Sequence, residues 1–225
     1  MTNTESAAQR ATALRHALAQ PDASSRLQAA LSAGTTPDPE YVEELIARCA
    51  IEPDFYVRDM LTWALTRQDP ALTLPRLLPE LHSPAPQARS QALHTLSKIA
   101  DPSIWPEIPP GLLVDEDDEV ARTAWRTSAG LVPEGAETAL AETLSTQFGR
   151  GDRDVQLSLS RAFAVIGEPA ASSVARATDH NEEHVRIHAI ATERIMSDPE
   201  EGFDAAIAEA RRVFALRSAP QTGDR

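Results

Sequence analysis

Arginine side chains supply the clearest recognition chemistry in this sequence. Arg122, Arg126 and Arg161 lie in amphipathic segments of the chain. A guanidinium group donates two parallel hydrogen bonds to a carboxylate or a phosphate group. Arginines that line one groove therefore predict a binding site for an acidic peptide or a phosphorylated partner protein.

Aromatic residues gather in one stretch of the chain. Tyr41, Phe55, Tyr56 and Trp63 lie close together, although the whole chain has only five Phe, three Trp and two Tyr. Tyr and Trp are common anchors at protein interfaces. Asp59 and Trp63 share one face of a helix, because they are four residues apart. We therefore add Tyr56, Asp59 and Trp63 to the candidate binding surface. The alternative is that Phe55 and Trp63 pack between neighbouring elements.

The segment HNEEH at residues 180–184 has a spacing that can hold zinc on a helix. Capping residues, Asp179 and Asn181, flank His180 and place it in a turn instead. His184 and His188, four residues apart, could still bind a metal weakly. The segment is therefore interpreted as the polar start of a helix, and no metal site is predicted.

Two other patterns are interpreted as structural. The run DEDDE at residues 115–119 is followed by Val120, where a calcium loop requires glycine, so it predicts a helix cap and a solvated turn. Cys49 is the only cysteine, which excludes an internal disulfide and favours a reducing compartment. It is expected to be a small buried side chain.

One amphipathic sequence motif, called the phrase below, recurs six times. The helices that its copies form must position these residues. Its clearest copy is Asp54–Leu65, DFYVRDMLTWAL, in which apolar residues recur every three or four positions. Asp54 stands where a helix N-cap belongs. The copies recur at roughly 30- to 35-residue intervals and align on Ser25, Val57, Ala88, Val120, Val155 and Val185.

A second helical segment, helix A, precedes each copy of the phrase, which is helix B. Each repeat is therefore predicted to be a helical hairpin. The expected A segments are Ser6–Ala19, Pro39–Ala50, Leu72–Leu81, Trp105–Val114, Glu137–Phe148 and Ala170–Thr178.

Proline and glycine predict where this pattern becomes irregular. Pro75 and Pro79 should bend one A helix, and Pro109-Pro110 should leave another short or irregular. The sequence around 149–151 predicts a longer turn. A final helix is expected at Pro199–Leu216, with Asp198 as its N-cap, and residues 218–225 are expected to form a disordered tail.

This pattern resembles the HEAT-repeat family, including its bacterial, phycobilin-lyase-like branch. The resemblance covers roughly residues 5–196. It is carried by prolines in the A helices and by the pairs Ser25-Arg26, Val57-Arg58, Ala88-Arg89 and Val185-Arg186. It implies an all-α, right-handed solenoid of about six helical hairpins with a C-terminal capping helix, forming one domain over residues 1–217.

The resemblance also assigns roles to the arginines. In HEAT proteins the B helices line the concave side, and arginines in the paired column bond to turn acids and carbonyl groups of neighbouring repeats. Arg122, Arg126 and Arg161 lie off that column and are the better candidates for binding a partner. The amino-acid sequences of the repeats are also similar to those of HEAT regions associated with MerR-like bacterial transcription regulators. This similarity makes a regulatory protein a candidate partner.

A different function class is kept as the alternative. A Trp, an Asp and arginines on a HEAT-like groove resemble the alkylpurine DNA glycosylases, in which a carboxylate stabilises the developing sugar cation. Here Asp59 precedes Trp63, which reverses the family's order, and no second aromatic residue matches downstream.

Composition favours the non-enzymatic alternative. The net charge of −13 disfavours binding to phosphate backbones, so nucleic acid is not expected as a partner. No apolar run is long enough to span a membrane, and the first residues have no signal-peptide pattern. We therefore predict a cytoplasmic, monomeric scaffold or adaptor with no catalytic residues, cofactor or metal, which binds a protein or acidic peptide on its concave B-helix surface.

Overall fold

The computed structural model describes residues 2–198 and 202–218, and all regular elements in these ranges are helices. Contacts within the chain divide it into two compact units, one up to Thr127 and the other from Ser128 onward. Each unit is described by itself. The expectation of one domain over residues 1–217 stays a prediction.

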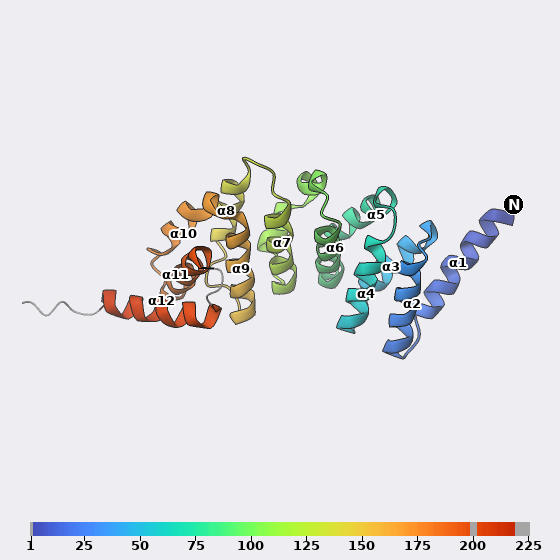
Figure 1. The fold of residues 1–225 in the computed structure, drawn as a ribbon, viewed down its shortest axis with the longest axis horizontal. Coiled ribbons are helices and arrows are strands. Elements are labelled where there is room, and N and C mark those ends of the chain that lie inside the picture. Colours follow the sequence, from blue (N-terminus) through green and yellow to red (C-terminus); the bar gives the residue numbers. More distant parts are fainter. Residues whose placement is uncertain (1, 199–201, 219–225) are drawn as a thin grey trace, which may run out of the picture. The chain divides into compact units, whose positions relative to one another are not determined.

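The first unit contains seven α-helices joined by short turns and 3₁₀ segments (Figure 1). In chain order these are α1 (Thr2–Leu18), α2 (Ala23–Thr35), the 3₁₀ helix η1 (Pro39–Tyr41), α3 (Val42–Cys49), α4 (Phe55–Thr66), α5 (Pro70–Leu77), η2 (Leu78–His82), α6 (Pro86–Ile99), η3 (Pro102–Glu107), η4 (Pro110–Val114) and α7 (Asp118–Leu131), whose last turn passes into the second unit.

Helices of the first unit form two layers. Helices α2, α4 and α6 pack side by side in one layer, and α1, α3 and α5 pack against them in the other. The buried leucines of both layers meet between them; Leu45 comes from α3, Leu61 from α4 and Leu93 from α6. This is the packing that amphipathic helices need, because each buries one apolar stripe and leaves its opposite face to solvent.

Helix α4 confirms the interpretation of its sequence. The carboxylate of Asp54 accepts hydrogen bonds from the backbone N–H groups of Tyr56 and Val57, at 2.9 and 3.1 Å. These bonds satisfy two of the donors that a helix start leaves unpaired. Val57 and Leu61 are buried on the predicted apolar face.

The irregular segments lie where proline predicts them. Pro75 lies inside α5, which ends at Leu77 and continues as the 3₁₀ helix η2. The segment with Pro109-Pro110 forms two 3₁₀ helices, η3 and η4, instead of an α-helix. A proline removes one backbone donor and clashes with the preceding turn, so a regular α-helix cannot form there.

The second unit is also built from two layers of helices. Its elements are α8 (Glu137–Ser145), α9 (Arg153–Ile166), the 3₁₀ helix η5 (Glu168–Ala170), α10 (Ala171–Ala177), α11 (Glu183–Ser197) and α12 (Phe203–Ser218). Helix α11 packs between α9 and α12, and α8 and α10 pack against each other. Phe163 of α9 stacks on Phe148 at a centroid distance of 4.9 Å, which fills the space between the layers.

The C-terminal helix differs from its expected bounds. Asp198 was expected as its N-cap, but the Asp198 N–H donates to the carbonyl of Arg194 and closes α11. Helix α12 begins at Phe203 instead of Pro199, and α11 ends at Ser197. Residues 199–201 lie outside the described residues. So does the expected disordered tail, except Ser218, which is the last residue of α12.

The arginines of the paired column bond to carbonyls of the turn in their own copy, whereas the family resemblance implies carbonyls of neighbouring repeats. The neighbouring turn supplies an acid to two of them, Glu52 to Arg26 and Asp115 to Arg89. Nη1 of Arg26 donates to the carbonyls of residues 20 and 21, and Nη1 of Arg58 donates to those of residues 52 and 53. Arg186 does the same with residues 180 and 181, and Arg89 with residue 83. Each arginine therefore satisfies carbonyl groups five or six residues before itself, at the turn that starts its own helix.

Glu52 is the most deeply buried acid of the first unit. Its carboxylate accepts two hydrogen bonds from Arg26, at 2.8 Å each, one from Arg48 at 2.7 Å, and one from the N–H of Asp54 at 2.9 Å. Burial alone would raise the pKa of Glu52. The hydrogen bonds and the charge of Arg48 outweigh it and lower the pKa from 4.5 to about 2.

We predict that Glu52→Gln destabilises the first unit by about 3 kcal/mol, because the buried guanidinium of Arg26 loses its charged partner. Urea unfolding followed by tryptophan fluorescence measures this unit alone, since Trp63, Trp105 and Trp125 all lie in it. The matched control is Glu43→Gln, which breaks a solvent-exposed pair with Arg76 and should cost less than about 1 kcal/mol.

The contribution of Glu52 to the stability of the first unit should depend on pH. The pKa of Glu52 is lower in the folded state, so the carboxylate stabilises the fold above pH 4.5, and this stabilisation is lost as the pH falls toward 2. Glu52→Gln should flatten this part of the profile. An unfolding midpoint equal to that of the Glu43→Gln control would show that the buried pair does not hold the unit together.

Candidate functional site

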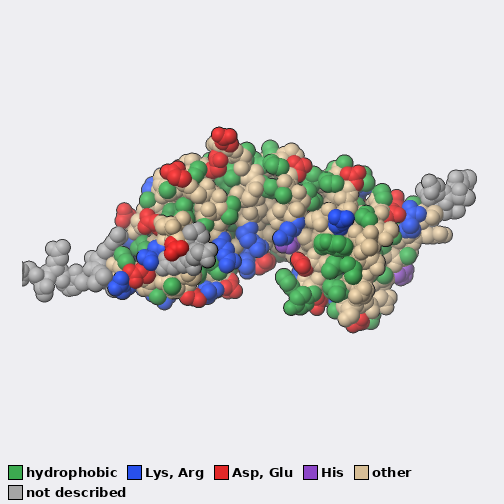
Figure 2. All heavy atoms as spheres, in the orientation of Figure 1, with side chains coloured by type: hydrophobic (Ala, Val, Ile, Leu, Met, Phe, Trp, Pro, Cys, Tyr) green, Lys and Arg blue, Asp and Glu red, His purple; other side chains and the backbone are tan. Residues whose placement is uncertain are grey.

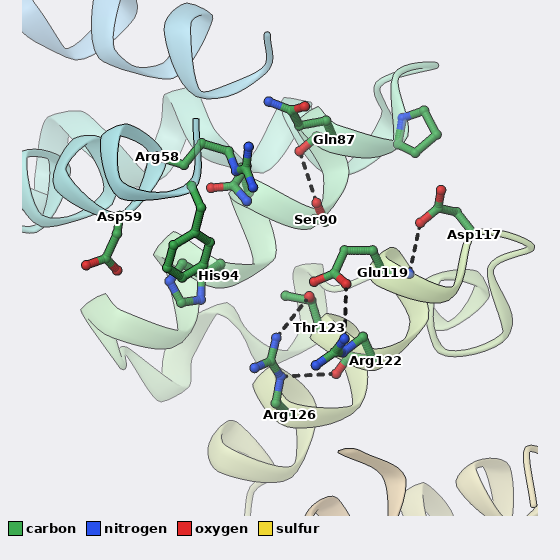
Figure 3. Close-up of a pocket in the computed structure, with 13 residues that line it drawn as sticks. Arg58, Asp59, Gln87, Ser90, His94, Asp117, Glu119, Arg122, Thr123 and Arg126 are labelled. Atoms are coloured by element: carbon green, nitrogen blue, oxygen red, sulfur yellow. Dashed lines mark hydrogen bonds and ion pairs between the residues drawn. The ribbon is translucent and has the colours of Figure 1, made fainter. Parts of the chain in front are cut away.

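A groove on the first unit is bounded by α4, α6 and α7 and has a volume of about 570 Å³ (Figure 3). We call it the α4–α7 groove, and it lies entirely before Thr127. Its lining residues are Phe55, Arg58, Asp59, Pro86, Gln87, Ser90, Gln91, His94, Asp117, Glu119, Arg122, Thr123 and Arg126.

Each helix contributes residues from one face. Residues 55, 58 and 59 come from α4, residues 87, 90, 91 and 94 from α6, and residues 119, 122, 123 and 126 from α7. Steps of three and four place side chains together on one side of a helix. The apolar positions of the same helices point into the core, so the groove is lined mainly by polar side chains.

Two of the predicted arginines form the α7 wall of the groove. Arg122 Nη1 lies 3.3 Å from a carboxylate oxygen of Glu119. Arg126 donates from Nη2 to the hydroxyl of Thr123 at 3.2 Å and from Nε to the Arg122 carbonyl at 3.4 Å (Figure 3). These contacts are long, and Arg126 is exposed, so its guanidinium can exchange them for contacts with a bound anion.

Three acids also line the groove, which balances its formal charge. Asp117 accepts the N–H groups of Glu119 and Val120, at 2.9 and 3.1 Å, and so caps the start of α7. Glu119 faces Arg122. Asp59 is exposed and points outward at the edge of the groove in Figure 3. Two of the acids therefore already have partners, Asp117 at the start of α7 and Glu119 at Arg122.

His94 lies half-buried in the groove between α4 and α7. Burial lowers its pKa, the positive charges of Lys98 and Arg126 lower it further, and Asp59 opposes them. The imidazole is therefore neutral at neutral pH and can donate or accept a hydrogen bond. The groove thus combines arginines with neutral polar groups, which suits a bound peptide.

Sequence reasoning did not identify His94, Ser90 or Gln87, although the repeat register contains a signal for them. Asp59, Ser90 and Arg122 occupy the same position in successive copies of the phrase. Trp63, His94 and Arg126 occupy another shared position. Helices packed in one layer present equivalent positions to the same surface, so these columns predict neighbours that no single helix shows.

Trp63 was expected in the binding surface but lies outside the groove lining. A Cβ atom on Gly34 of α2 would come within 2.2 Å of the Trp63 ring, so the indole packs directly over this glycine. The alternative interpretation, packing between neighbouring helices, therefore describes Trp63. It does not describe Phe55, which is 65% exposed.

Tyr56 is 74% exposed at the start of α4 and contacts the ring of Phe55 edge-on, at 5.6 Å between centroids. It does not line the groove, whereas Phe55 does. On the face drawn in Figure 2, hydrophobic side chains gather over α4, with a histidine and basic side chains beside them. The two rings therefore form an apolar edge next to the polar groove.

The predicted site residues do not all lie in one unit or in one groove. It brings together Arg122, Arg126 and Asp59 in one groove, with Tyr56 near its edge and Trp63 turned toward α2. Arg161 is exposed on α9, which belongs to the second unit. Because Asp59 lines the groove and Trp63 does not, the pair required for the glycosylase-like alternative does not meet in one pocket.

The HNEEH segment begins before α11, as predicted, since His180 lies in the turn and the helix starts at Glu183. The expected caps are corrected: the N-cap is Glu182, and its N–H is held by Nδ1 of His180 at 3.1 Å. Neither Asp179 nor Asn181 occupies the cap position, because the turn runs one residue further. No group of three potential metal ligands converges within the described residues.

His188 is a buried structural residue. Its Nδ1 accepts the N–H of Gly149 at 3.0 Å, and Nε2 lies 3.0 Å from the carbonyl of Gln156 and 3.1 Å from the hydroxyl of Ser160. Because Nδ1 accepts, Nε2 carries the proton and donates it. Burial lowers the pKa of His188 to about 4, although the Gln156 carbonyl opposes this shift. A second proton on Nδ1 would face the Gly149 N–H.

We predict that acid weakens the second unit through His188. Its pKa is 6.5 in the unfolded chain and about 4 in the fold, so the unfolded state binds the proton first. Stability is therefore full above pH 6.5 and declines toward pH 4, by about 3 kcal/mol in total. Hydrogen exchange of peptides from α9 and α11 measures the decline.

His188→Gln should remove most of this pH dependence, at the cost of lower stability at neutral pH. The control is His184→Gln, because His184 is exposed and should leave the profile unchanged. A profile that keeps its slope in His188→Gln would assign the acid sensitivity to another group.

Burial raises the pKa of the Cys49 thiol to about 12, so this side chain is the neutral, buried group that the sequence predicts.

Comparison with known proteins adds no family assignment: the chain matches no family model, and no curated protein shows significant sequence similarity to it. In the described part of the chain, none of the helices is both long enough and apolar enough to cross a membrane.

Proposed function

We propose that this protein is a HEAT-like repeat protein that binds an acidic segment of a partner protein in the α4–α7 groove and catalyses no reaction. It acts as a monomeric cytoplasmic scaffold or adaptor. The single observation that carries the proposal is the groove itself, in which Arg58, Arg122 and Arg126 from two different helices line one cavity.

The repeated arginine contact supports a right-handed, HEAT-like solenoid. Arg26, Arg58, Arg89 and Arg186 each donate to a carbonyl six residues earlier, in four separate copies of the phrase. The two layers of helices in each unit also suit stacked hairpins. Because each hairpin buries its apolar face only against its neighbours, the helix surfaces left over are available for binding.

The chemistry of the groove supports an acidic peptide as its ligand. Arginine matches carboxylate groups with two parallel hydrogen bonds, and Gln91 and His94 add neutral partners for a peptide backbone. The exposed rings of Phe55 and Tyr56 beside the groove supply apolar contact area. Aromatic anchors next to polar contacts are typical of protein interfaces.

The partner is a protein rather than a nucleic acid. A net charge of −13 repels a phosphate backbone over its whole length, whereas a short acidic segment meets the groove alone. The resemblance of the repeats to HEAT regions associated with MerR-like regulators makes a transcription regulator a candidate partner. The glycosylase-like alternative is less well supported, because Asp59 and Trp63 do not share a pocket.

We predict that the double variant Arg122→Ala/Arg126→Ala binds a short, fluorescein-labelled, Glu-rich peptide at least about tenfold more weakly than the wild type, since it removes the guanidinium groups of one groove wall. Fluorescence anisotropy measures the dissociation constant. A matched peptide with Gln in place of Glu should bind weakly to both proteins.

The control variant is Arg76→Ala, which removes an arginine of α5 that pairs with Glu43 on the same unit but lies outside the groove. It should bind like the wild type. Arg161→Ala tests whether the second unit contributes to binding. Equal affinity of the double variant and Arg76→Ala, or preference for duplex DNA over the peptide, would reject the proposal.

A further inference from the structure

Two arginines of the paired column bind a carboxylate in addition to their turn carbonyls. Arg26 donates from Nε and Nη2 to the two oxygens of Glu52, at 2.8 Å each. Arg89 donates from the same two nitrogens to Asp115, at 3.0 Å each. In both cases the acid stands in the turn before the next B helix, so it joins one repeat to the next.

Ser83 occupies the equivalent position in the turn before α6. Each copy has one position in the paired arginine column, and in α4, α6 and α7 these positions are Arg58, Arg89 and Ala121. Six residues before them stand Glu52, Ser83 and Asp115. Their side-chain oxygens also make the same local bond, since each accepts the N–H two residues later, at 2.9, 3.3 and 3.0 Å. The acid that should face Arg58 is therefore replaced by a short, neutral hydroxyl.

Arg58 is left half-satisfied by this replacement. Its Nη1 donates to the carbonyls of residues 52 and 53, as in the other copies. In the part of the chain that the structure describes, its Nε and Nη2 make none of the carboxylate bonds seen for Arg26 and Arg89. Arg58 instead lines the α4–α7 groove and extends from α4 toward α6 in Figure 3.

The guanidinium of Arg58 is held in position, although its other edge, formed by Nε and Nη2, is open. The two carbonyl bonds hold Nη1, and the ring of Phe55 lies 5.9 Å from the guanidinium carbon. A cation held over an aromatic ring loses little further entropy when it binds an anion. The open edge is therefore prepared for a ligand with two oxygen atoms in one plane.

We propose that Arg58 is the oxyanion-binding residue of the α4–α7 groove, and that a carboxylate or phosphoryl group of the bound segment takes the place that Glu52 and Asp115 occupy beside Arg26 and Arg89. This inference rests on the proposed function, since it names the group of the partner that the groove recognises. The partner supplies in trans the acid that this repeat lacks.

The decisive variant is Ser83→Asp. It places an acid at the position that Glu52 and Asp115 have in their own copies, and it changes no residue that lines the groove. The new carboxylate should pair with Arg58 as Asp115 pairs with Arg89, and so block the site. We expect the Glu-rich peptide to bind about tenfold more weakly, because one charge-assisted bidentate contact is lost. Ser83→Asn is the matched neutral control and should keep wild-type affinity.

A stability measurement accompanies the binding measurement. If the new acid pairs with Arg58, the midpoint of urea unfolding, read from tryptophan fluorescence, should not fall below that of Ser83→Asn. Ser83→Glu, which matches the side chain of Glu52, serves as the second variant if Ser83→Asp unfolds. Arg58→Lys keeps the charge but removes the two-pronged donor, and it should also bind about tenfold more weakly.

Two peptides distinguish the source of the oxyanion. One carries Glu at the tested position and the other carries phosphoserine. Tighter binding of the phosphoserine peptide, lost in Ser83→Asp, supports a phosphoryl ligand. Equal binding of both peptides, lost in the same variant, supports a carboxylate.

The inference fails separately from the proposed function. If Ser83→Asp binds both peptides like Ser83→Asn while Arg122→Ala/Arg126→Ala loses them, the groove binds acidic segments without Arg58, and this inference is overturned. If the wild type binds neither peptide, the proposed function fails as well.

Discussion

The fold of the first unit depends on how it satisfies the turn that precedes each B helix. Such a turn leaves carbonyl groups that precede the helix and therefore find no partner within it. An arginine one turn into the helix reaches back to them, as Arg26 does to residues 20 and 21. Its other edge binds Glu52, so the same side chain also joins α2 to the turn before α4. One guanidinium therefore specifies both the start of a helix and the stacking of its neighbour.

The groove surface is formed by side chains at equivalent positions of the recurring sequence. Because equivalent positions face the same side, Asp59, Ser90 and Arg122 form one row and Trp63, His94 and Arg126 form another. Packing still reassigns single members, and Trp63 covers Gly34 of α2 instead of the groove. Equivalent positions in the recurring sequence therefore carry different side chains in the groove, although the helices that hold them are similar.

The local features were predictable from sequence because their causes are local. The cap of Asp54 and the breaks caused by prolines depend on residues within one turn, and both are found where the pattern predicts them. Two errors concern helix ends, and the role of His188 depends on a tertiary contact. Asp198 closes α11 because that helix extends to Ser197, and Glu182 is the N-cap of α11 because the turn before it runs one residue further. The buried role of His188 depends on Gly149, which lies 39 residues away.

The charges that a short bound segment meets are those inside the groove. Exposed charges separated by more than about 8 to 10 Å are largely screened at physiological salt, so the total of −13 acts on a long phosphate backbone much more than on a short segment in the groove. What decides the groove is which charges are already engaged. Asp117 caps a helix and Glu119 faces Arg122, whereas Arg58 lacks the acid that its position has in other repeats. The absence of one structural carboxylate, at Ser83, therefore changes the recognition chemistry of the groove more than the surrounding acidic surface does.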